Sequence, residues 1–243
     1  MDGTDILTLT DPVAEPAPQK MIRSRGLVFP DDPAVITPKL RRLLRRRDYE
    51  AREAAAVRAL VGKEDVALEL GGGIGYMSTL MARCCKAKAV FSFEANPTLI
   101  PYIERVYAAN KVTTAHVTNA LLGPKAGTAT FYERANFLAS SLSADAPGEK
   151  SEVIREHQVD ILPIGEVMAE IRPTALVCDI EGAEADLLPL ADLSSLRVAV
   201  IELHPQWVGQ SGVQAVFDAF HAHGLTFYPR TSNKKVVTFL KGW

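Results

Sequence analysis

The sequence has few cysteines, no excess of charge of either sign and no long hydrophobic run. Its three cysteines are the adjacent pair Cys84 and Cys85 and the distant Cys178, a spacing that fits neither a zinc site nor a disulfide framework. Buried free thiols in a reducing cytoplasm are therefore expected. A formal net charge of −2 gives no support to a nucleic-acid partner. Without a membrane-length apolar run or a signal-peptide core, we expect neither membrane attachment nor secretion.

What the sequence does contain is a glycine-rich stretch that directly follows a short apolar segment of strand type, Val66–Leu70. Helical composition follows from Tyr76 to Cys85. The turn between the two segments consists largely of Gly71, Gly72, Gly73 and Gly75. Such a turn brings backbone N–H groups and a helix N-terminus close to a ligand, since no side chains stand in the way.

The spacing of these glycines indicates which ligand is bound. A dinucleotide fingerprint needs Gly-x-Gly-x-x-Gly, and its last position would be Tyr76 or Ser78, depending on the starting glycine. An NAD-dependent oxidoreductase is therefore disfavoured. The chain instead has an acidic residue, Glu69, followed by alternate glycines at 71, 73 and 75. This pattern resembles motif I of the class I methyltransferases, which use S-adenosylmethionine.

Carboxylates near the turn agree with that resemblance, because S-adenosylmethionine carries a sulfonium cation, an ammonium group and a ribose. Glu94 ends the next predicted strand, where a carboxylate can accept both ribose hydroxyls. Asn119 follows the third strand and offers an amide to the adenine edge. The predicted donor site comprises Glu69, Gly71, Gly72, Gly73, Gly75, Tyr76, Glu94, Ala95, Asn119, Ala120 and Asp179.

Strand and helix signals alternate along most of the chain, which predicts an α/β fold with a mostly parallel sheet and helices on both faces. The expected strands cover residues 66–70, 87–93, 112–118, 175–178, 198–203, 225–228 and 235–240. The alternation breaks between Gly123 and Ile164, where residues 128–133 and 158–164 read as an antiparallel β insertion between strands 3 and 4. The polar stretch 140–148 inside it would be either a substrate cover or a flexible surface hairpin.

The N-terminal part is predicted as a mobile tail over 1–20 and a helical segment over 21–62, before a catalytic domain over 63–243. A short extended piece is expected between Met21 and Val35. A helical stretch is expected to begin at Thr37–Pro38 and to end at Gly62, with a break in the helix near Asp48. The arginines between 41 and 47 are interpreted as a solvated face, with a phosphate anchor as the alternative.

A second acidic cluster follows the strand at 175–178. Asp179, Glu181 and Glu184 would repel one another unless a positive group sits among them, although Glu184 also suits the first turn of a helix. Asp179 and Glu181 are expected to face the same crevice as the glycine turn. His204 ends the next strand and would be a general base or a structural hydrogen-bonding group. Asp179, Glu181 and His204 are thus the candidate catalytic residues.

Three stretches together resemble the FkbM-type methyltransferases: Leu68–Gly75, Phe93–Pro97 and Val177–Glu184. Tyr49–Glu50 and Ile201–His204 are in keeping with them, and the similarity covers roughly residues 49 to 228, on our reading of strand order. One departure is Glu94-Ala-Asn-Pro, where many relatives have Glu-Pro. The resemblance implies a Rossmann-like, seven-stranded sheet with one antiparallel edge strand, and methyl transfer to hydroxyl groups of sugars, polyketides and related natural products.

The sequence therefore predicts an S-adenosylmethionine-dependent O-methyltransferase acting on a small hydroxylated acceptor. Its alternatives are an N-methyltransferase, an RNA ribose methyltransferase and a nucleotide-binding module without catalysis. A divalent cation such as Mg²⁺, held by Asp179 and Glu181, could replace a protein base, although three good ligands are not evident from the sequence. A cytoplasmic protein is expected, and a homo-oligomer is compatible with the sequence.

Overall fold

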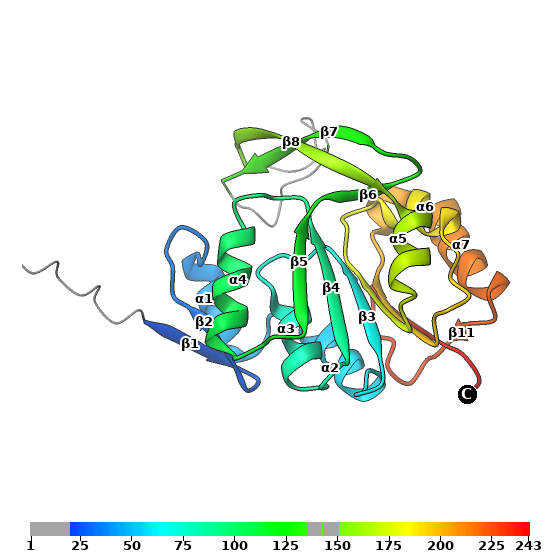
Figure 1. Cartoon of the computed structure of the whole chain (residues 1–243), viewed down its shortest axis with the longest axis horizontal. Helices are drawn as coiled ribbons and strands as arrows, with labels where there is room; N and C mark the ends of the chain where they lie inside the picture. The colour runs from blue at the N-terminus through cyan, green and yellow to red at the C-terminus, as the bar shows by residue number, and fades with distance from the viewer. Residues whose placement is uncertain (1–19, 136–141, 143–150) are drawn as a thin grey trace, which may run out of the picture.

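The protein is described by a computed structural model that covers residues 20–135, 142 and 151–243. A seven-stranded sheet forms its centre, with strand order β11-β12-β10-β9-β3-β4-β5 (Figure 1). The strands are β3 (Val66–Leu70), β4 (Ala89–Glu94), β5 (Ala115–Asn119), β9 (Ala175–Cys178), β10 (Val198–Glu202), β11 (Thr226–Phe227) and β12 (Val236–Leu240). The expected mostly parallel α/β sheet is confirmed, because β10, β9, β3, β4 and β5 all run parallel.

One detail of the predicted sheet is wrong. The antiparallel strand is β12, and it lies one position in from the edge, between β10 and the two-residue strand β11. Because β11 runs antiparallel to β12, it points in the same direction as the parallel strands. The closing hairpin thus inserts its second strand next to β10, so that the backbone groups of β10 are paired on both sides.

Alternating side chains divide the sheet between two hydrophobic cores. Along β9, Ala175 and Val177 belong to one core and Leu176 and Cys178 to the other, as the period of two in a strand requires. The first core holds α1 (Pro38–Arg46), α2 (Ala51–Leu60), α3 (Tyr76–Arg83) and α4 (Ile100–Ala109). The second holds α5 (Ile164–Ile171), α6 (Glu184–Leu187), the 3₁₀ turn Leu188–Leu190 and α7 (Pro205–Ala222).

The N-terminal segment packs onto the first core. A hairpin of β1 (Met21–Ser24) and β2 (Leu27–Pro30) precedes α1, where the sequence predicts only a short extended piece. The side chain of Thr37 caps α1 by accepting from the backbone N–H of Leu40, and the expected break separates α1 from α2. Except for Lys20, the predicted mobile tail lies outside the described residues.

The predicted β insertion forms a separate three-stranded sheet, ordered β6-β8-β7, across the carboxyl ends of the parallel strands (Figure 1). It consists of β6 (Leu121–Gly123), β7 (Gly127–Arg134) and β8 (Val153–Pro163). Glu133 joins it to the loop after β4, because its carboxylate accepts from Thr98 Oγ1 at 3.0 Å and lies 2.7 Å from His157 Nε2. The expected cover over 140–148 falls, apart from Leu142, outside the described residues.

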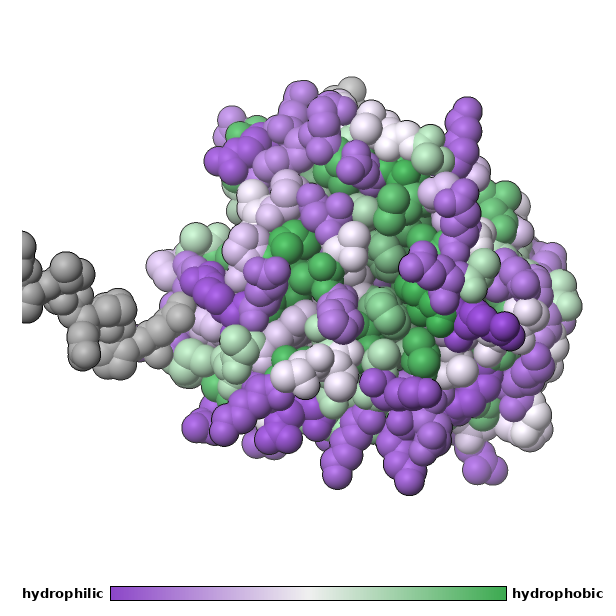
Figure 2. Space-filling view, in the orientation of Figure 1, coloured by the Kyte–Doolittle hydropathy of each residue, from purple (hydrophilic) through white to green (hydrophobic). Residues whose placement is uncertain are grey.

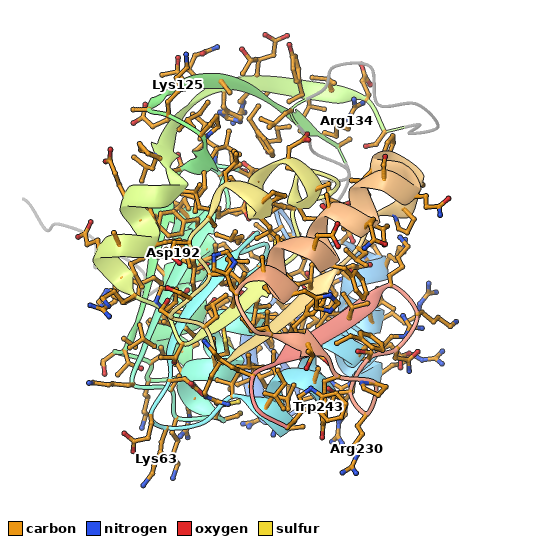
Figure 3. All side chains as sticks on the ribbon, turned by 90° about the vertical axis from the view of Figure 1, so that its right-hand side faces the viewer. Lys63, Lys125, Arg134, Asp192, Arg230 and Trp243 are labelled. Atoms are coloured by element: carbon orange, nitrogen blue, oxygen red, sulfur yellow. The ribbon has the colours of Figure 1, made fainter. Side chains whose placement is uncertain are left out.

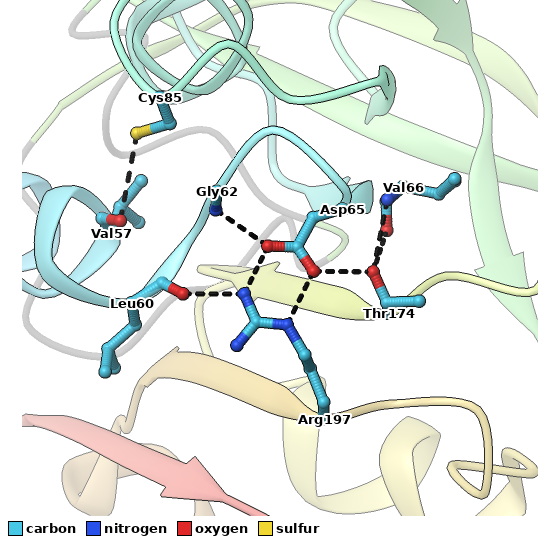
Figure 4. Close-up of polar contacts among 8 residues, drawn as sticks. All are labelled: Val57, Leu60, Gly62, Asp65, Val66, Cys85, Thr174 and Arg197. Carbon is cyan, nitrogen blue, oxygen red and sulfur yellow. Dashed lines mark hydrogen bonds and ion pairs between the residues drawn. The ribbon is translucent and has the colours of Figure 1, made fainter.

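The opposite end of the sheet is tied together by Asp65 (Figure 4). This buried carboxylate accepts from the backbone N–H of Gly62, from the hydroxyl of Thr174 and from the guanidinium of Arg197. These residues immediately precede or flank the beginnings of β3, β9 and β10. A single carboxylate therefore joins three neighbouring strands at the end remote from the glycine turn.

The surface is charged at both ends of the domain. Lys63 and Arg230 project from the end near Asp65, whereas Lys125 lies at the end formed by the insertion (Figure 3). Hydrophobic side chains are visible between these regions on one face of the molecule (Figure 2). Within the part of the chain that the structure describes, no helix is both long and apolar enough to cross a membrane.

Candidate active site

The glycine turn lies where the strand order reverses, between β3 and its neighbours β4 and β9. Gly71 has φ +88°, and a Cβ there would stand 1.9 Å from the carbonyl oxygen of Asp179. A Cβ on Gly72 would be 2.8 Å from Ser92 Oγ. The turn is therefore packed tightly between β9 and β4, the two strands that flank β3, which only residues without side chains permit. Ligands of open α/β sheets bind at such a reversal point.

Glu69 and Tyr76 shape this turn from behind. Glu69 is 1% exposed and accepts hydrogen bonds from Ser92 Oγ and from the backbone N–H of Ser78, at the first turn of α3. Burial raises the pKa of Glu69 to about 7, and the two serines offset part of that effect. The Tyr76 ring is fully buried and stacks on Phe29. Both side chains thus fix the position of the turn, and direct contact with the donor stays a prediction.

Glu94 reaches the same turn from the end of β4. Its Oε2 accepts from the backbone N–H of Gly73 and its Oε1 from that of Asn96, each at 2.7 Å. Burial raises the pKa of Glu94, against the effect of these N–H groups. Each oxygen retains a second lone pair, so the carboxylate can still accept from two hydroxyls. Its position next to the glycines is the one that the ribose prediction requires.

Asn119 and Ala120 lie one strand further along the sheet. The Asn119 amide donates to the carbonyls of Glu94 and Ala95, at 2.8 and 2.9 Å. Both N–H positions are thereby used, and the side-chain oxygen is the atom left to accept from a ligand. Ala120 is 3% exposed. Asn119 consequently holds the loop after Glu94 in place, and this also positions Ala95.

Asp179, Glu181 and His204 come together as the sequence predicts, because β9 and β10 are adjacent. His204 Nε2 lies 3.2 Å from Glu181 Oε2 and 3.6 Å from Asp179 Oδ1. The third acid of the cluster, Glu184, is fully buried, and its carboxylate accepts from the backbone N–H groups of Gly182 and His204. Glu184 therefore has a structural role, and it fixes the position of His204.

The protonation of this cluster follows from its burial and its many carboxylates. Burial and the nearby charges of Glu202 and Glu181 raise the pKa of Asp179 well above its usual value. Burial lowers the pKa of His204, but Glu184 and Glu181 outweigh that effect, and the net shift is upward. Asp179 and His204 thus bind protons more tightly than isolated side chains would, which is expected of groups that exchange a proton with a ligand.

Residues 61–240 match the family of the Methyltransferase FkbM domain. The protein belongs to this family. It is a methyltransferase, and S-adenosylmethionine is its methyl donor. The match spans the glycine turn and every strand of the seven-stranded sheet, which confirms the resemblance seen in the sequence. No curated protein matches the sequence.

Solved structures of other proteins resemble this chain over most of its length. M. jannaschii TYW2, solved in complex with AdoMet, shares 13% sequence identity with this FkbM-family chain at a TM-score of 0.50. The aligned region covers 92% of this chain and 87% of TYW2. Precorrin-6y C5,15-methyltransferase from Geobacter metallireducens GS-15 shares 11% sequence identity with this chain at a TM-score of 0.48. The aligned region covers 88% of this chain and 94% of that enzyme. At 13% identity the similarity to TYW2 concerns the fold alone.

The FkbM-family chain also places acids at the site that sequence reasoning did not assign. Glu50 and Glu53, from the beginning of α2, lie close enough to repel Asp179. Burial raises the pKa of Glu50 to about 8, and a hydrogen bond with Tyr49 offsets part of the shift. In the sequence, only the Tyr49–Glu50 pair points to these two acids. Nothing in the residues of α2 indicates that this helix packs beside β10.

Proposed function

We propose that the protein transfers a methyl group from S-adenosylmethionine to a hydroxyl group of a small acceptor such as a sugar. The observation that supports this function is the position of His204, held beside Asp179 and Glu181 at the strand ends next to the glycine turn. An aliphatic hydroxyl is a poor nucleophile until its proton is removed. A buried imidazole with carboxylates on either side is suited to that task.

In this proposal the donor lies across the ends of β3, β4 and β5. The backbone at Gly71, Gly73 and Gly75 accommodates its methionine part, and Glu94 accepts from the ribose hydroxyls. Asn119 and Ala120 meet the adenine. The turn approaches Asp179 closely, so the donor's sulfonium would lie beside the acidic cluster, where the negative charges favour it.

The chemistry is an in-line displacement at the methyl carbon. The acceptor oxygen forms the new C–O bond, while the C–S bond breaks and its electron pair returns to sulfur, which becomes a neutral thioether. The hydroxyl proton passes to His204 or to a carboxylate of the cluster and then to water. The protein contributes mainly by aligning oxygen, carbon and sulfur, and by accepting the proton.

Substitution of His204 tests this function. His204→Gln is expected to lower kcat for hydroxylated acceptors about 100-fold, the usual contribution of a general base, with little change in donor affinity. His221→Gln, an exposed position on α7, is the matched control. The measurement is transfer of labelled methyl from S-adenosylmethionine to panels of sugars and amines. Full activity of His204→Gln, or product from amines alone, would contradict the proposal.

An amine acceptor is the second candidate, because the surplus of carboxylates around Asp179 would also attract an ammonium group. RNA ribose methylation has less support. Arg41 pairs with Asp31 at 2.7 Å and Arg46 with Asp48 at 3.0 Å, which agrees with a solvated basic face. A module without catalysis would bind the donor and yield no methylated product in either panel.

A further inference from the structure

Three side chains from different segments converge at the carboxyl end of the sheet. Asp179 follows β9, Glu181 lies in the next turn and His204 follows β10. Each offers one ligand atom, and these atoms all lie within 4.8 Å of one another. Two carboxylates and an imidazole at such separations can bind one metal ion together, with only small movements of the side chains.

The imidazole of His204 is oriented toward this point. Its side chain is 3% exposed, and Nε2 faces Asp179 and Glu181. On the other side of the ring, Nδ1 faces the fully buried carboxylate of Glu184 at 3.4 Å. Histidines that bind metals usually direct their second nitrogen at a carboxylate, which fixes the tautomer and leaves the first nitrogen free to coordinate. Glu184 has the required position.

Asp179 provides a separate observation. Its Oδ1 is buried, yet it accepts no hydrogen bond from any residue within the described part of the chain. Further negative charge surrounds it, because Glu202, Glu50 and Glu53 also lie close enough to repel it. A buried carboxylate oxygen without a donor, among other carboxylates, is stabilised if a cation binds there.

We propose that Asp179, Glu181 and His204 bind a divalent cation, with Glu184 as the group that positions the histidine. Two carboxylates suit Mg²⁺ and Mn²⁺, and the imidazole shifts the preference toward Mn²⁺. The role of this metal rests on the proposed function. A metal in this place would bind the acceptor hydroxyl and make its proton more acidic. In that case His204 holds the metal and does not take the proton, which leaves to water through a carboxylate of the cluster, while the bonds formed and broken in the methyl transfer stay the same.

The site is tested by binding of Mn²⁺ alone to the full chain after dialysis against a chelator. Free Mn²⁺ is counted by its electron paramagnetic resonance signal, which weakens when the ion binds. One Mn²⁺ per chain is expected, with at least a tenfold weaker affinity in Glu181→Gln and in Asp179→Asn. Glu181 is about half exposed, so its substitution does not disturb the core. Glu156→Gln, an exposed acid on β8, is the matched control.

Two results would overturn the metal site. One is the absence of saturable Mn²⁺ binding up to millimolar concentration, and the other is equal affinity in the wild type, Glu181→Gln and Asp179→Asn. Methyl transfer to hydroxyl acceptors in the presence of excess chelator would also reject the metal, while leaving the proposed function intact. Conversely, the protein could bind Mn²⁺ at these residues and methylate only amines. That result would support the metal site and contradict the hydroxyl acceptor.

Discussion

Glu94 illustrates how one side chain can serve both the fold and the ligand. Its two oxygens accept from the backbone N–H groups of Gly73 and Asn96, and these bonds hold the turn and the loop after β4 at fixed positions. A neutral amide cannot replace this carboxylate without cost, because its NH₂ group would face one of the two donors.

We therefore expect Glu94→Gln to weaken S-adenosylmethionine binding at least tenfold. The expected cause is the combined loss of a ribose acceptor and of the turn geometry, with about 1–3 kcal/mol for the mismatched hydrogen bond. Isothermal titration calorimetry at low temperature measures the affinity while the variant is folded. Glu104→Gln, an exposed acid on α4, is the control. An unchanged affinity of Glu94→Gln would remove the ribose assignment.

At the scale of elements, the beginnings of three strands depend on Asp65. Burial raises the pKa of Asp65, but hydrogen bonds from Arg197, Gly62 and Thr174 outweigh that effect and the net shift is downward. A carboxylate whose pKa is lower in the folded state stabilises the fold above its unfolded pKa of about 3.9. This contribution is lost as the pH falls through the folded pKa.

Asp65→Asn is accordingly expected to lower the free energy of unfolding at pH 7 by about 2–3 kcal/mol, since a buried pair is broken but Arg197 is partly exposed. The difference from the wild type should shrink below about pH 4, where Asp65 itself becomes protonated. Urea unfolding at several pH values measures this. Glu64→Gln, an exposed neighbour, should change little. A difference that is the same at every pH would contradict the assignment.

For the molecule as a whole, the two cores meet at the site. The helix α3, which follows the glycine turn, belongs to the first core, whereas α7, which follows His204, belongs to the second. A ligand that contacts both sides stabilises the complete fold, because it binds only when the strand ends are assembled.

S-adenosylmethionine at about 100 times its Kd should add roughly 2.7 kcal/mol of stability. In a domain of this size that corresponds to a rise in Tm of about 5–11 °C, measurable by a thermal melt. NAD at the same concentration is the control and should leave the Tm unchanged, because Tyr76 and Ser78 stand where its fingerprint needs glycine. A similar rise with NAD would contradict the donor specificity.

Local patterns account for the elements that were predicted well. Alternating strand and helix signals located the parallel strands, and the glycine stretch located the turn between β3 and α3. The helix α5 and the short strand β6 were not predicted, because α5 begins where β8 ends and β6 begins one residue after β5, so no loop separates either from the preceding strand. The start of α7 at Pro205 was also missed, since Gly209 interrupts its helical pattern with φ +65°.

The sequence by itself determined the fold class, the donor and the residues at the strand ends, because strand period and glycine spacing are local properties of the chain. Only the tertiary structure decided how these side chains are placed around the glycine turn. It placed Glu69 and Glu184 in supporting positions, and it brought Glu50 and Glu53 from α2 beside Asp179. Such contacts depend on how distant segments pack, and the local sequence carries no record of that packing.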